Sequence, residues 1–160
     1  MATPTRIVAG LISDTHGLLR PGVHTALQGV DLIIHAGDVG GSDILDELRL
    51  IAPVHAVYGN TDPAGDPSLE GELTIPLDGI EVHVSHGHEL GSPTPEKLVA
   101  AYHHQVIIYG HTHLPLIERI GEQLVINPGA AGPRRFKLAP SVARMTIAGG
   151  KAEVEIVSLA

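Results

Sequence analysis

Five strand-length apolar segments, each followed at once by a cluster of polar residues, constrain the fold of this chain most. The segments are residues 7–12, 31–36, 54–58, 80–85 and 105–109, and the first is continuously apolar, which is typical of a strand covered on both faces. Open sheets place their binding sites beyond the carboxyl ends of the strands. We therefore expect the fold to bring the five polar clusters together at one site. These clusters are Asp14-Thr15-His16, Gly37-Asp38, Gly59-Asn60-Thr61-Asp62, Ser85-His86-Gly87-His88 and Gly110-His111-Thr112-His113.

Helix and hairpin signals between these segments predict the architecture. Pro21 can open a helix over residues 21–29, Ser42 can cap one over 42–50, and Thr94 can cap one over 95–103. The first half is therefore β-α-β-α-β, which favours a parallel core sheet. The second half is rich in hairpins, with turns at residues 78–79, 121–122 and 148–150. We expect an α/β fold in which helices flank a two-sheet mixed β-sandwich, formed as a single domain over residues 1–160.

Charge and composition exclude several classes of function. The formal net charge of −8 argues against a nucleic-acid coat or an anionic membrane surface as a stable partner, although bound cations would still admit a phosphate substrate. Cysteine is absent, so disulfides, thiolate metal sites and thiol catalysis are excluded. The sequence shows neither a signal peptide nor a membrane-length apolar run, so we expect a cytoplasmic protein.

The strand-end clusters carry seven side chains that suit metal ions. Seven ligands are too many for one tetrahedral ion and suit two ions that share a bridging carboxylate. Asp38 is the expected bridge, because the glycines around it allow a close approach. Mixed imidazole, carboxylate and amide ligands suit manganese, iron or zinc rather than calcium. The candidate ligands are Asp14, His16, Asp38, Asn60, His86, His111 and His113.

The spacing divides these ligands into two sets but leaves the two histidines of the last cluster open. Either His111 or His113 would complete each set. The first ion would take Asp14, His16, Asp38 and one of these histidines, and the second would take Asp38, Asn60, His86 and the other.

Two such ions imply a particular chemistry. Divalent ions about 3.5–4 Å apart polarise a phosphoryl oxygen and generate hydroxide from a water molecule near neutral pH. Their charge would exceed that of the two carboxylates Asp14 and Asp38, which leaves a positive site in an acidic protein. The sequence therefore predicts hydrolysis of a phosphate ester by a metal-activated water, with Asp38, Asn60 and His86 as catalytic residues.

The five motifs, in this order, resemble those of the calcineurin-like metallophosphoesterase superfamily over residue 7 to about residue 134. More narrowly, the chain is similar to the small prokaryotic phosphodiesterase branch, to which the retromer scaffold subunit of eukaryotes is related. The resemblance implies a two-sheet αββα sandwich, with His113 on the first ion and His111 on the second. It also implies two divalent ions, manganese first with iron, zinc or nickel as alternatives, and a homo-oligomer. Asn127-Pro128-Gly129 would lie near the phosphate pocket.

The chain departs from the superfamily pattern at two positions. Many members carry a histidine after the metal-binding asparagine, as a phosphate contact or general acid. Thr61 stands there in this chain, and a threonine does not deliver a proton near pH 7. The serine that often follows the Asn-Pro-Gly segment is Ala130. The remaining candidate substrate contacts are Asn60, Thr61, His88 and Arg134.

Single residues of the clusters also have structural interpretations. Asp14 alone could cap a helix and Asn60 alone could be a turn residue, but five coincident clusters favour a metal site. His35 and His55 lie inside predicted strands, where we expect them to be buried and bonded to backbone groups. Asp62 is expected to orient a neighbouring group rather than to bind metal.

Three functions remain open at this point. The favoured interpretation is a two-metal phosphodiesterase that acts on a small phosphoester substrate. The alternative is a non-catalytic metal-binding scaffold for protein–protein assembly, which need not keep all seven ligands. A metal storage or sensor protein is disfavoured, because the two ligand sets are asymmetric and imply an open, phosphate-sized site.

Overall fold

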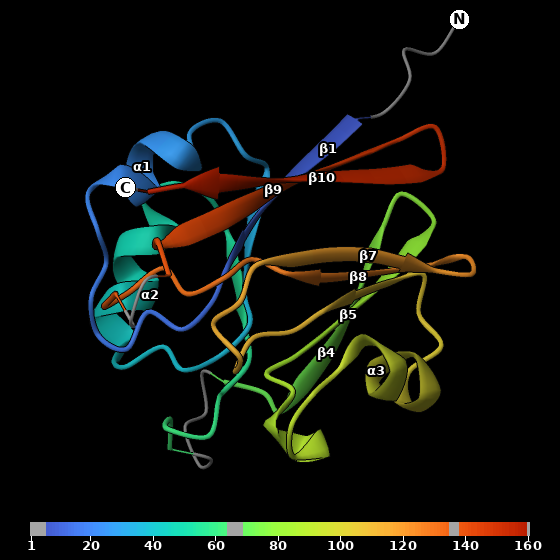
Figure 1. Cartoon of the computed structure of the whole chain (residues 1–160). Coiled ribbons are helices and arrows are strands. Elements are labelled where there is room, and N and C mark those ends of the chain that lie inside the picture. The colour runs from blue at the N-terminus through green and yellow to red at the C-terminus, as the bar shows by residue number, and fades with distance from the viewer. Residues whose placement is uncertain (1–5, 64–68, 135–137, 160) are drawn as a thin grey trace, which may run out of the picture.

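Two five-stranded sheets form the body of the molecule, seen in a computed structural model that describes residues 6–63, 69–134 and 138–159. The first sheet has the strand order β10-β9-β1-β2-β3 and the second has the order β4-β5-β6-β8-β7 (Figure 1). The first-sheet strands are β1 (Arg6–Ile12), β2 (Leu32–His35), β3 (Val54–Ala56), β9 (Ser141–Ala148) and β10 (Lys151–Ser158). The second-sheet strands are β4 (Glu72–Leu77), β5 (Ile80–Ser85), β6 (Val106–Ile108), β7 (Leu116–Ile120) and β8 (Gln123–Asn127).

Each sheet has a parallel centre and an antiparallel edge. In the first sheet, β1, β2 and β3 are parallel, while β9 pairs antiparallel with β1 and β10 with β9. In the second sheet, β5, β6 and β8 are parallel, and β4 and β7 add antiparallel hairpin strands at its two edges. The predicted parallel core and the three predicted hairpins are confirmed, because continuous apolar runs and two- or three-residue turns are strong local signals.

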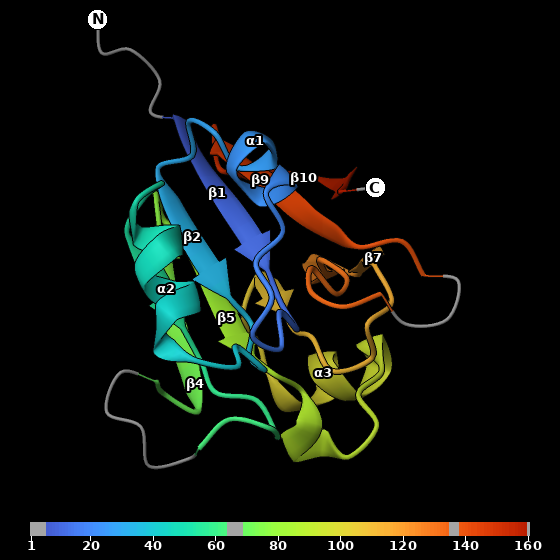
Figure 2. The same cartoon turned by 90° about the vertical axis from the view of Figure 1, so that its left-hand side faces the viewer.

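The helices cover the outer faces of the sandwich. They are α1 (Gly22–Ala26), α2 (Ser42–Arg49) and α3 (Pro95–Ala101), with a short 3-10 helix, η1 (His88–Leu90). Leu27 and Leu48 pack on the first sheet beside α1 and α2, which lie in front of β1 and β2 in Figure 2. Leu98 of α3 packs on Ile107 and Val125 of the second sheet, and a separate apolar cluster fills the space between the sheets. The predicted helix-flanked mixed sandwich is therefore confirmed.

Three local predictions need correction. Helix α1 ends at Ala26 rather than near residue 29. The predicted cap Ser42 is the first residue of α2, and Gly41 occupies the N-cap position without a side-chain hydrogen bond. His55 is exposed, because β3 is the edge strand of its sheet and lacks a neighbour on one side. In contrast, Thr94 caps α3 as predicted, accepting a hydrogen bond from the N–H of Lys97 at 3.2 Å.

The parallel ladders continue beyond the strands into the polar clusters. In the first sheet the N–H of Asp14 donates to the carbonyl of Gly37 at 3.0 Å, and that of His16 to the carbonyl of Asp38 at 2.9 Å. In the second sheet the N–H of Gly110 donates to the carbonyl of His86 at 3.0 Å. The loops that carry the candidate ligands are thus fixed by the sheets themselves. None of the helices in the described ranges is long and apolar enough to cross a membrane.

A further buried histidine, His83, lies in β5 just before the Ser85-His86-Gly87-His88 cluster. His83 is 1% exposed, its ring stacks on Tyr102 with a centroid separation of 3.7 Å, and its Nε2 lies 2.9 Å from the Ser85 hydroxyl. Burial, with a contribution from His104, lowers the pKa of His83 from 6.5 to about 4. A neutral imidazole is therefore the folded form at neutral pH.

The burial of His83 predicts that the free energy of unfolding depends on pH. The variant His83→Phe should show a weaker dependence. Between pH 6.5 and 4 the unfolded chain binds a proton at His83 that the folded chain does not, so stability is full above pH 6.5 and is lost as the pH falls. At pH 5 the loss through this one group is about 2 kcal/mol in the free energy of unfolding. Phenylalanine keeps the ring stack without a titrating group. Urea titrations of both proteins at pH 7.5 and 5 should show the difference, and equal losses would contradict the assignment.

Candidate metal centre

Five loops meet at the carboxyl edge of the two sheets and bring the predicted ligands together. The loops follow β1, β2 and β3 in the first sheet and β5 and β6 in the second, so the site lies where the two sheets face each other. Its carboxylates are among the least accessible in the chain, since Asp14 is 0% exposed and Asp38 is 3% exposed. In strand order the loops supply Asp14 and His16, Asp38, Asn60, His86, and His111 with His113.

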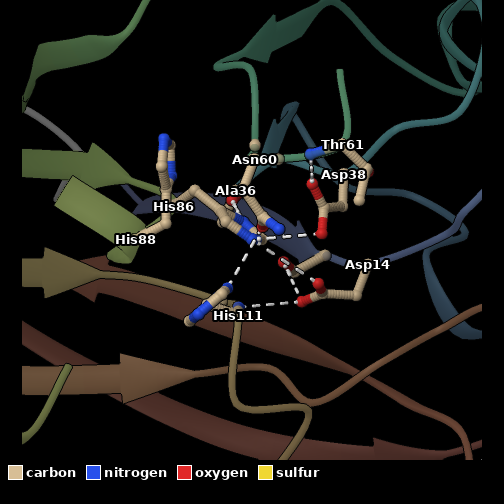
Figure 3. Close-up of polar contacts among 12 residues, drawn as sticks. Asp14, Ala36, Asp38, Asn60, Thr61, His86, His88 and His111 are labelled. Atoms are coloured by element: carbon tan, nitrogen blue, oxygen red, sulfur yellow. Dashed lines mark hydrogen bonds and ion pairs between the residues drawn. The ribbon is translucent and has the colours of Figure 1, made fainter. Parts of the chain in front are cut away.

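Imidazole nitrogens surround the free oxygens of the two carboxylates. Asp14 Oδ1 lies 3.3 Å from His113 Nε2, 3.7 Å from His16 Nε2 and 3.8 Å from His86 Nε2. Asp38 Oδ2 lies 3.2 Å from His86 Nε2 and 3.7 Å from His16 Nε2. In Figure 3 the side chains of Asp14, Asp38 and His86 point toward one another. Two donor atoms that share an ion at about 2.1 Å are about 3.0–3.4 Å apart, so two of these separations, Asp14–His113 and Asp38–His86, suit a shared cation directly.

Each ligand is held in place by the atom that does not face the centre. Asp14 Oδ2 accepts hydrogen bonds from the Ser13 hydroxyl at 2.7 Å and from the His111 N–H at 3.2 Å, which leaves Oδ1 for the centre. Asp38 Oδ1 accepts from the N–H of Thr61 at 2.9 Å, which leaves Oδ2. His86 Nδ1 donates to the carbonyl of residue 36 at 2.8 Å, so the lone pair is on Nε2, the nitrogen that faces the carboxylates.

Two of the atoms that face the centre are buried without a hydrogen-bond partner among the described residues. Asp14 Oδ1 and His86 Nε2 are both inaccessible and have no hydrogen bond within the described part of the chain. Buried polar atoms are normally satisfied, and each exception requires an explanation. A bound cation would explain these two atoms, and the surrounding donor atoms have the spacing that a cation requires. Asp14, His16 and His113 form one group with metal-ligand spacing, and Asp14, Asp38 and His86 form another.

Asn60 and His111 extend the second group. His111 Nδ1 lies 3.1 Å from Asn60 Oδ1, and the His111 ring is 5.2 Å from that of His86. Both side chains are more accessible than the carboxylates, so this side of the centre opens to solvent. The structure therefore places all seven predicted residues around one centre, with His113 next to Asp14 and His111 next to Asn60.

The two carboxyl groups are held in their charged forms. Burial alone would raise the pKa of Asp14, but the imidazoles of His113 and His16, the charge of His86 and the Ser13 hydroxyl outweigh it and hold that pKa well below its usual range. The same competition, with His86 and the Thr61 N–H as the lowering groups, brings the pKa of Asp38 to about 2. Both groups are anions at neutral pH and can bind a cation.

The backbone at the centre has an unusual conformation. Six non-glycine residues in the described part of the chain have positive φ angles, and only one of them, Asp78, lies in an ordinary hairpin turn. Such angles are uncommon for residues with a side chain and persist where the surrounding structure fixes them, often at functional sites. The other five are Asp14, His16, Asp38, His111 and His113, with φ between 46° and 70°.

Two glycines make room for the carboxylates. A Cβ on Gly59 would overlap Asp38 Oδ1 and its backbone nitrogen, and a Cβ on Gly110 would overlap the Ser13 hydroxyl and lie 2.8 Å from Asp14 Oδ2. The positions before Asn60 and His111 thus have no room for a Cβ, because a carboxylate approaches the backbone there. This limits the residue to glycine more strictly than a turn conformation would.

Asp62 holds the loops that present Asp38 and Asn60. Its carboxylate accepts hydrogen bonds from the N–H groups of Val39 at 2.9 Å, Gly40 at 3.1 Å and Gly59 at 3.0 Å. The residue predicted to orient a neighbouring group is therefore confirmed in that role. It ties the loop after β2 to the loop after β3.

His35 acts similarly beneath the first loop. It is fully buried, its Nδ1 accepts from the N–H of Gly37 at 3.1 Å, and its Nε2 lies 3.0 Å from the Thr15 hydroxyl. Burial lowers the pKa of His35 to about 4, so its Nε2–H donates to Thr15, whose hydroxyl donates in turn to the carbonyl of Val39 at 2.7 Å. The prediction of a buried histidine bonded to backbone groups holds at this position.

Asn127 braces the loop after β6. Its side-chain amide donates to the carbonyl of Gly110 at 3.1 Å and to the Thr112 hydroxyl at 3.0 Å, and its oxygen accepts from the N–H of Gly129 at 2.9 Å. The Asn-Pro-Gly segment therefore lies beside the His111 loop, where it fixes the backbone.

Sequence reasoning missed a support behind His86. Glu89 accepts hydrogen bonds from the N–H of Gly87 at 3.0 Å and from the Tyr102 hydroxyl at 2.8 Å. Tyr102 is the C-cap residue of α3, so this contact joins the His86 turn to a distant helix. No local pattern signals such a pair. Ser13 escaped notice for a similar reason, since a serine before an aspartate has no distinctive spacing.

The candidate substrate contacts are less uniformly placed. The ring of His88 lies 5.4 Å from that of His86 and 6.4 Å from that of His111, and Figure 3 shows it beside His86. Thr61 contributes its backbone N–H to Asp38. Arg134 is exposed, in the loop that follows Gly132, whose N–H donates to the carbonyl of Asp14 at 3.2 Å.

Known proteins are similar to this chain in sequence and in fold. The family model of the calcineurin-like phosphoesterase superfamily domain matches residues 7–150. A "Probable metallophosphoesterase" of Methanothermobacter thermautotrophicus is 32% identical over 162 residues, covering 94% of this chain and 92% of that protein. The phosphodiesterase YfcE of Escherichia coli is 32% identical over 143 residues, covering 74% and 76%. The structure of vacuolar protein sorting 29 from Cryptosporidium parvum superposes with a TM-score of 0.79 at 19% identity, covering 95% and 97%.

Removal of the Asp62 carboxylate should disturb both stability and metal binding. Asp62→Ala leaves three backbone N–H groups without their acceptor, which costs about 1–3 kcal/mol in the free energy of unfolding. Loss of a group that orients ligands typically weakens metal affinity about 10–100-fold. Urea titration and calorimetric titration with Mn²⁺ measure the two effects. Asp46→Ala, which removes an exposed carboxylate from α2, is the matched control, and similar behaviour of the two variants would contradict the assigned role.

Proposed function

The chain belongs to the calcineurin-like phosphoesterase superfamily, and on this basis we propose that it is a metal-dependent phosphodiesterase. The observation that carries the proposal is the unpartnered, fully buried Asp14 Oδ1, which three imidazole nitrogens approach to within 3.3–3.8 Å. A buried carboxylate oxygen in this setting is a metal ligand rather than a structural group.

Two overlapping ligand sets fit the donor atoms. We assign the bridging role to Asp38, whose Oδ2 lies 3.7 Å from His16 Nε2 and 3.2 Å from His86 Nε2, one imidazole of each set. Asp14 is the residue common to the two groups with metal-ligand spacing, so it lies next to both positions. When bound, two divalent ions would supply positive charge to a phosphoryl oxygen and a water molecule activated as the nucleophile. We assign manganese first, with iron, zinc or nickel as alternatives, because the ligands are mixed imidazole, carboxylate and amide. The first set is Asp14, His16, Asp38 and His113, and the second is Asp38, Asn60, His86 and His111.

The residues at the open side of the centre would bind the substrate. The amide of Asn60 and the ring of His88 lie where the second group faces solvent, beside His111. Thr61 uses its N–H on Asp38 and has no group that donates a proton near pH 7. The leaving oxygen would therefore depart without help from this position, which favours phosphodiesters whose leaving groups are weakly basic.

The relative from Escherichia coli is named as a phosphodiesterase, which supports the diester assignment over a monoester. The proposal includes a small, soluble phosphoester as substrate, which the ligand chemistry favours. It also includes a cytoplasmic setting, with which the lack of cysteine in the sequence agrees.

A scaffold function is the second candidate. The fold superposes on vacuolar protein sorting 29 over nearly its whole length, and that similarity extends to the fold alone. A scaffold would bind metal without hydrolysing esters. Activity therefore separates the two functions where metal binding does not.

Metal removal and single substitutions test the phosphodiesterase proposal. Metal-stripped protein should not hydrolyse bis(p-nitrophenyl) phosphate, and added Mn²⁺ should restore hydrolysis. Asp38→Asn and His86→Ala should each lower kcat about 100-fold or more, because each removes a ligand atom at the centre.

The control is Asp46→Asn, whose carboxylate is exposed on α2 and 2.9 Å from Arg49. It should retain wild-type activity. If the wild-type protein binds Mn²⁺, Fe²⁺, Zn²⁺ and Ni²⁺ but remains inactive with each of them, the hydrolase proposal is wrong and the scaffold function stands.

A further inference from the structure

Large apolar side chains are exposed at few places on the described surface. They are Leu18, Leu50, Leu114 and Ile117. Two of the four are close in sequence to candidate metal ligands. Leu18 is two residues after His16, and Leu114 is the residue after His113. Leu18 is 40% exposed and Leu114 is 52% exposed. Isolated exposed leucines need no explanation, but their concentration beside a site does.

The two leucines are fixed next to the centre by the turns that carry them. The N–H of Leu18 donates to the carbonyl of Thr15 at 2.9 Å, which closes the turn around His16. The N–H of Leu114 donates to the Thr112 hydroxyl at 3.3 Å. The rings of His16 and His113 are 5.4 Å apart, so the two turns meet at the first ligand set.

A loop of small residues joins the two turns. The N–H of Gly132 donates to the carbonyl of Asp14, on the Leu18 side. At the other end, a Cβ on Gly129 would lie 3.4 Å from the Pro115 ring, on the Leu114 side. Pro115 and Pro133 are exposed along this path. Leu18, Pro133, Pro115 and Leu114 are therefore exposed apolar residues on neighbouring loops beside the first ligand set, and together they are called here the apolar rim.

The charge of the apolar rim differs from that of the whole chain. The formal net charge is −8, yet residues 15–20, 111–117 and 128–134 contain no Asp or Glu. The exposed cation Arg134 follows Pro133 directly. The opposite side of the centre is polar, with Asn60, Thr61 and His88. A ligand that spans the centre would meet polar groups on one side and apolar groups on the other.

We propose that the apolar rim binds one ester group of the substrate, and that this group is large and apolar, such as an aryl or long alkyl group. The inference rests on the proposed phosphodiesterase function and adds the class of substrate. The phosphoryl group would lie at the metal centre, and the apolar arm would cover Leu18 and Leu114. An arm of this kind gains affinity by removing apolar surface from water, and a charged or sugar arm gains none there.

Two diesters with the same leaving group test the inference. They are p-nitrophenyl phenyl phosphate and p-nitrophenyl methyl phosphate, both of which release p-nitrophenolate. The quantity measured is the ratio of their kcat/KM values, so that the intrinsic reactivities cancel when proteins are compared. In the double variant Leu18→Ser/Leu114→Ser this ratio should fall about tenfold, mainly through a higher KM for the phenyl ester. Leu18→Met/Leu114→Met, which keeps the apolar surface, should keep the wild-type ratio.

Leu50→Ser is the matched control, because Leu50 is an 82% exposed leucine at the far end of α2. It should leave both esters at wild-type rates. An unchanged ratio in the double serine variant, with both esters still hydrolysed, would overturn the inference while the phosphodiesterase function stands. If the wild-type protein hydrolyses neither ester with any of the four metal ions, both proposals fall together.

Discussion

The arrangement of the whole site depends on one buried carboxylate. Asp14 is inaccessible, charged, and bonded through Oδ2 to Ser13 and to the backbone of His111, so it joins the first sheet to the second. An isolated buried anion costs several kcal/mol. Imidazoles alone compensate this charge only partly, since none of their nitrogens makes a hydrogen bond to Asp14 Oδ1 within the described residues. A cation between them would complete the balance, and the donor set and the fold both favour this chemistry.

The sheets supply the precision that such a centre requires. The five ligands with positive φ angles would relax if their loops were free, but ladder hydrogen bonds, the accepting carboxylate of Asp62 and the donating side-chain amide of Asn127 hold the backbone. Strain of this kind persists only where neighbouring contacts over-determine the conformation. The two parallel sheet centres therefore do more than form a core: they align five strand ends so that ligands from residues 14 to 113 share one point.

Much of this could be predicted from local sequence patterns, and the failures have physical causes. Apolar runs with polar ends located the strands and the seven side chains that meet, because strand ends of parallel sheets share an edge. The wrong assignments, Ser42 as a cap and His55 as a buried residue, depended on neighbours in space that a pattern does not contain. The same holds for the Glu89–Tyr102 contact, whose partners come from η1 and from the end of α3. Ser13 was missed for another reason: its hydroxyl bonds the adjacent Asp14, and this pair has no distinctive spacing. Local patterns thus predicted which residues meet at the centre and two of their supports, Asp62 and His35, but not the supports that Ser13, Glu89 and Tyr102 provide.

The residue at position 61 and the apolar rim have a common consequence for the proposed reaction. Thr61 uses its N–H to hold Asp38 and would offer no acid to the leaving oxygen, so the proposed hydrolysis would depend on the leaving group and on how firmly the substrate is held. Binding energy from a remote part of a substrate can orient the reacting group, and Leu18 and Leu114 are placed to provide it. A site with a strong acid would need less from such contacts. In this chain the exposed leucines lie beside the centre, where contacts with the substrate would position the phosphoryl group. This proposed contact would explain why the leucines are exposed.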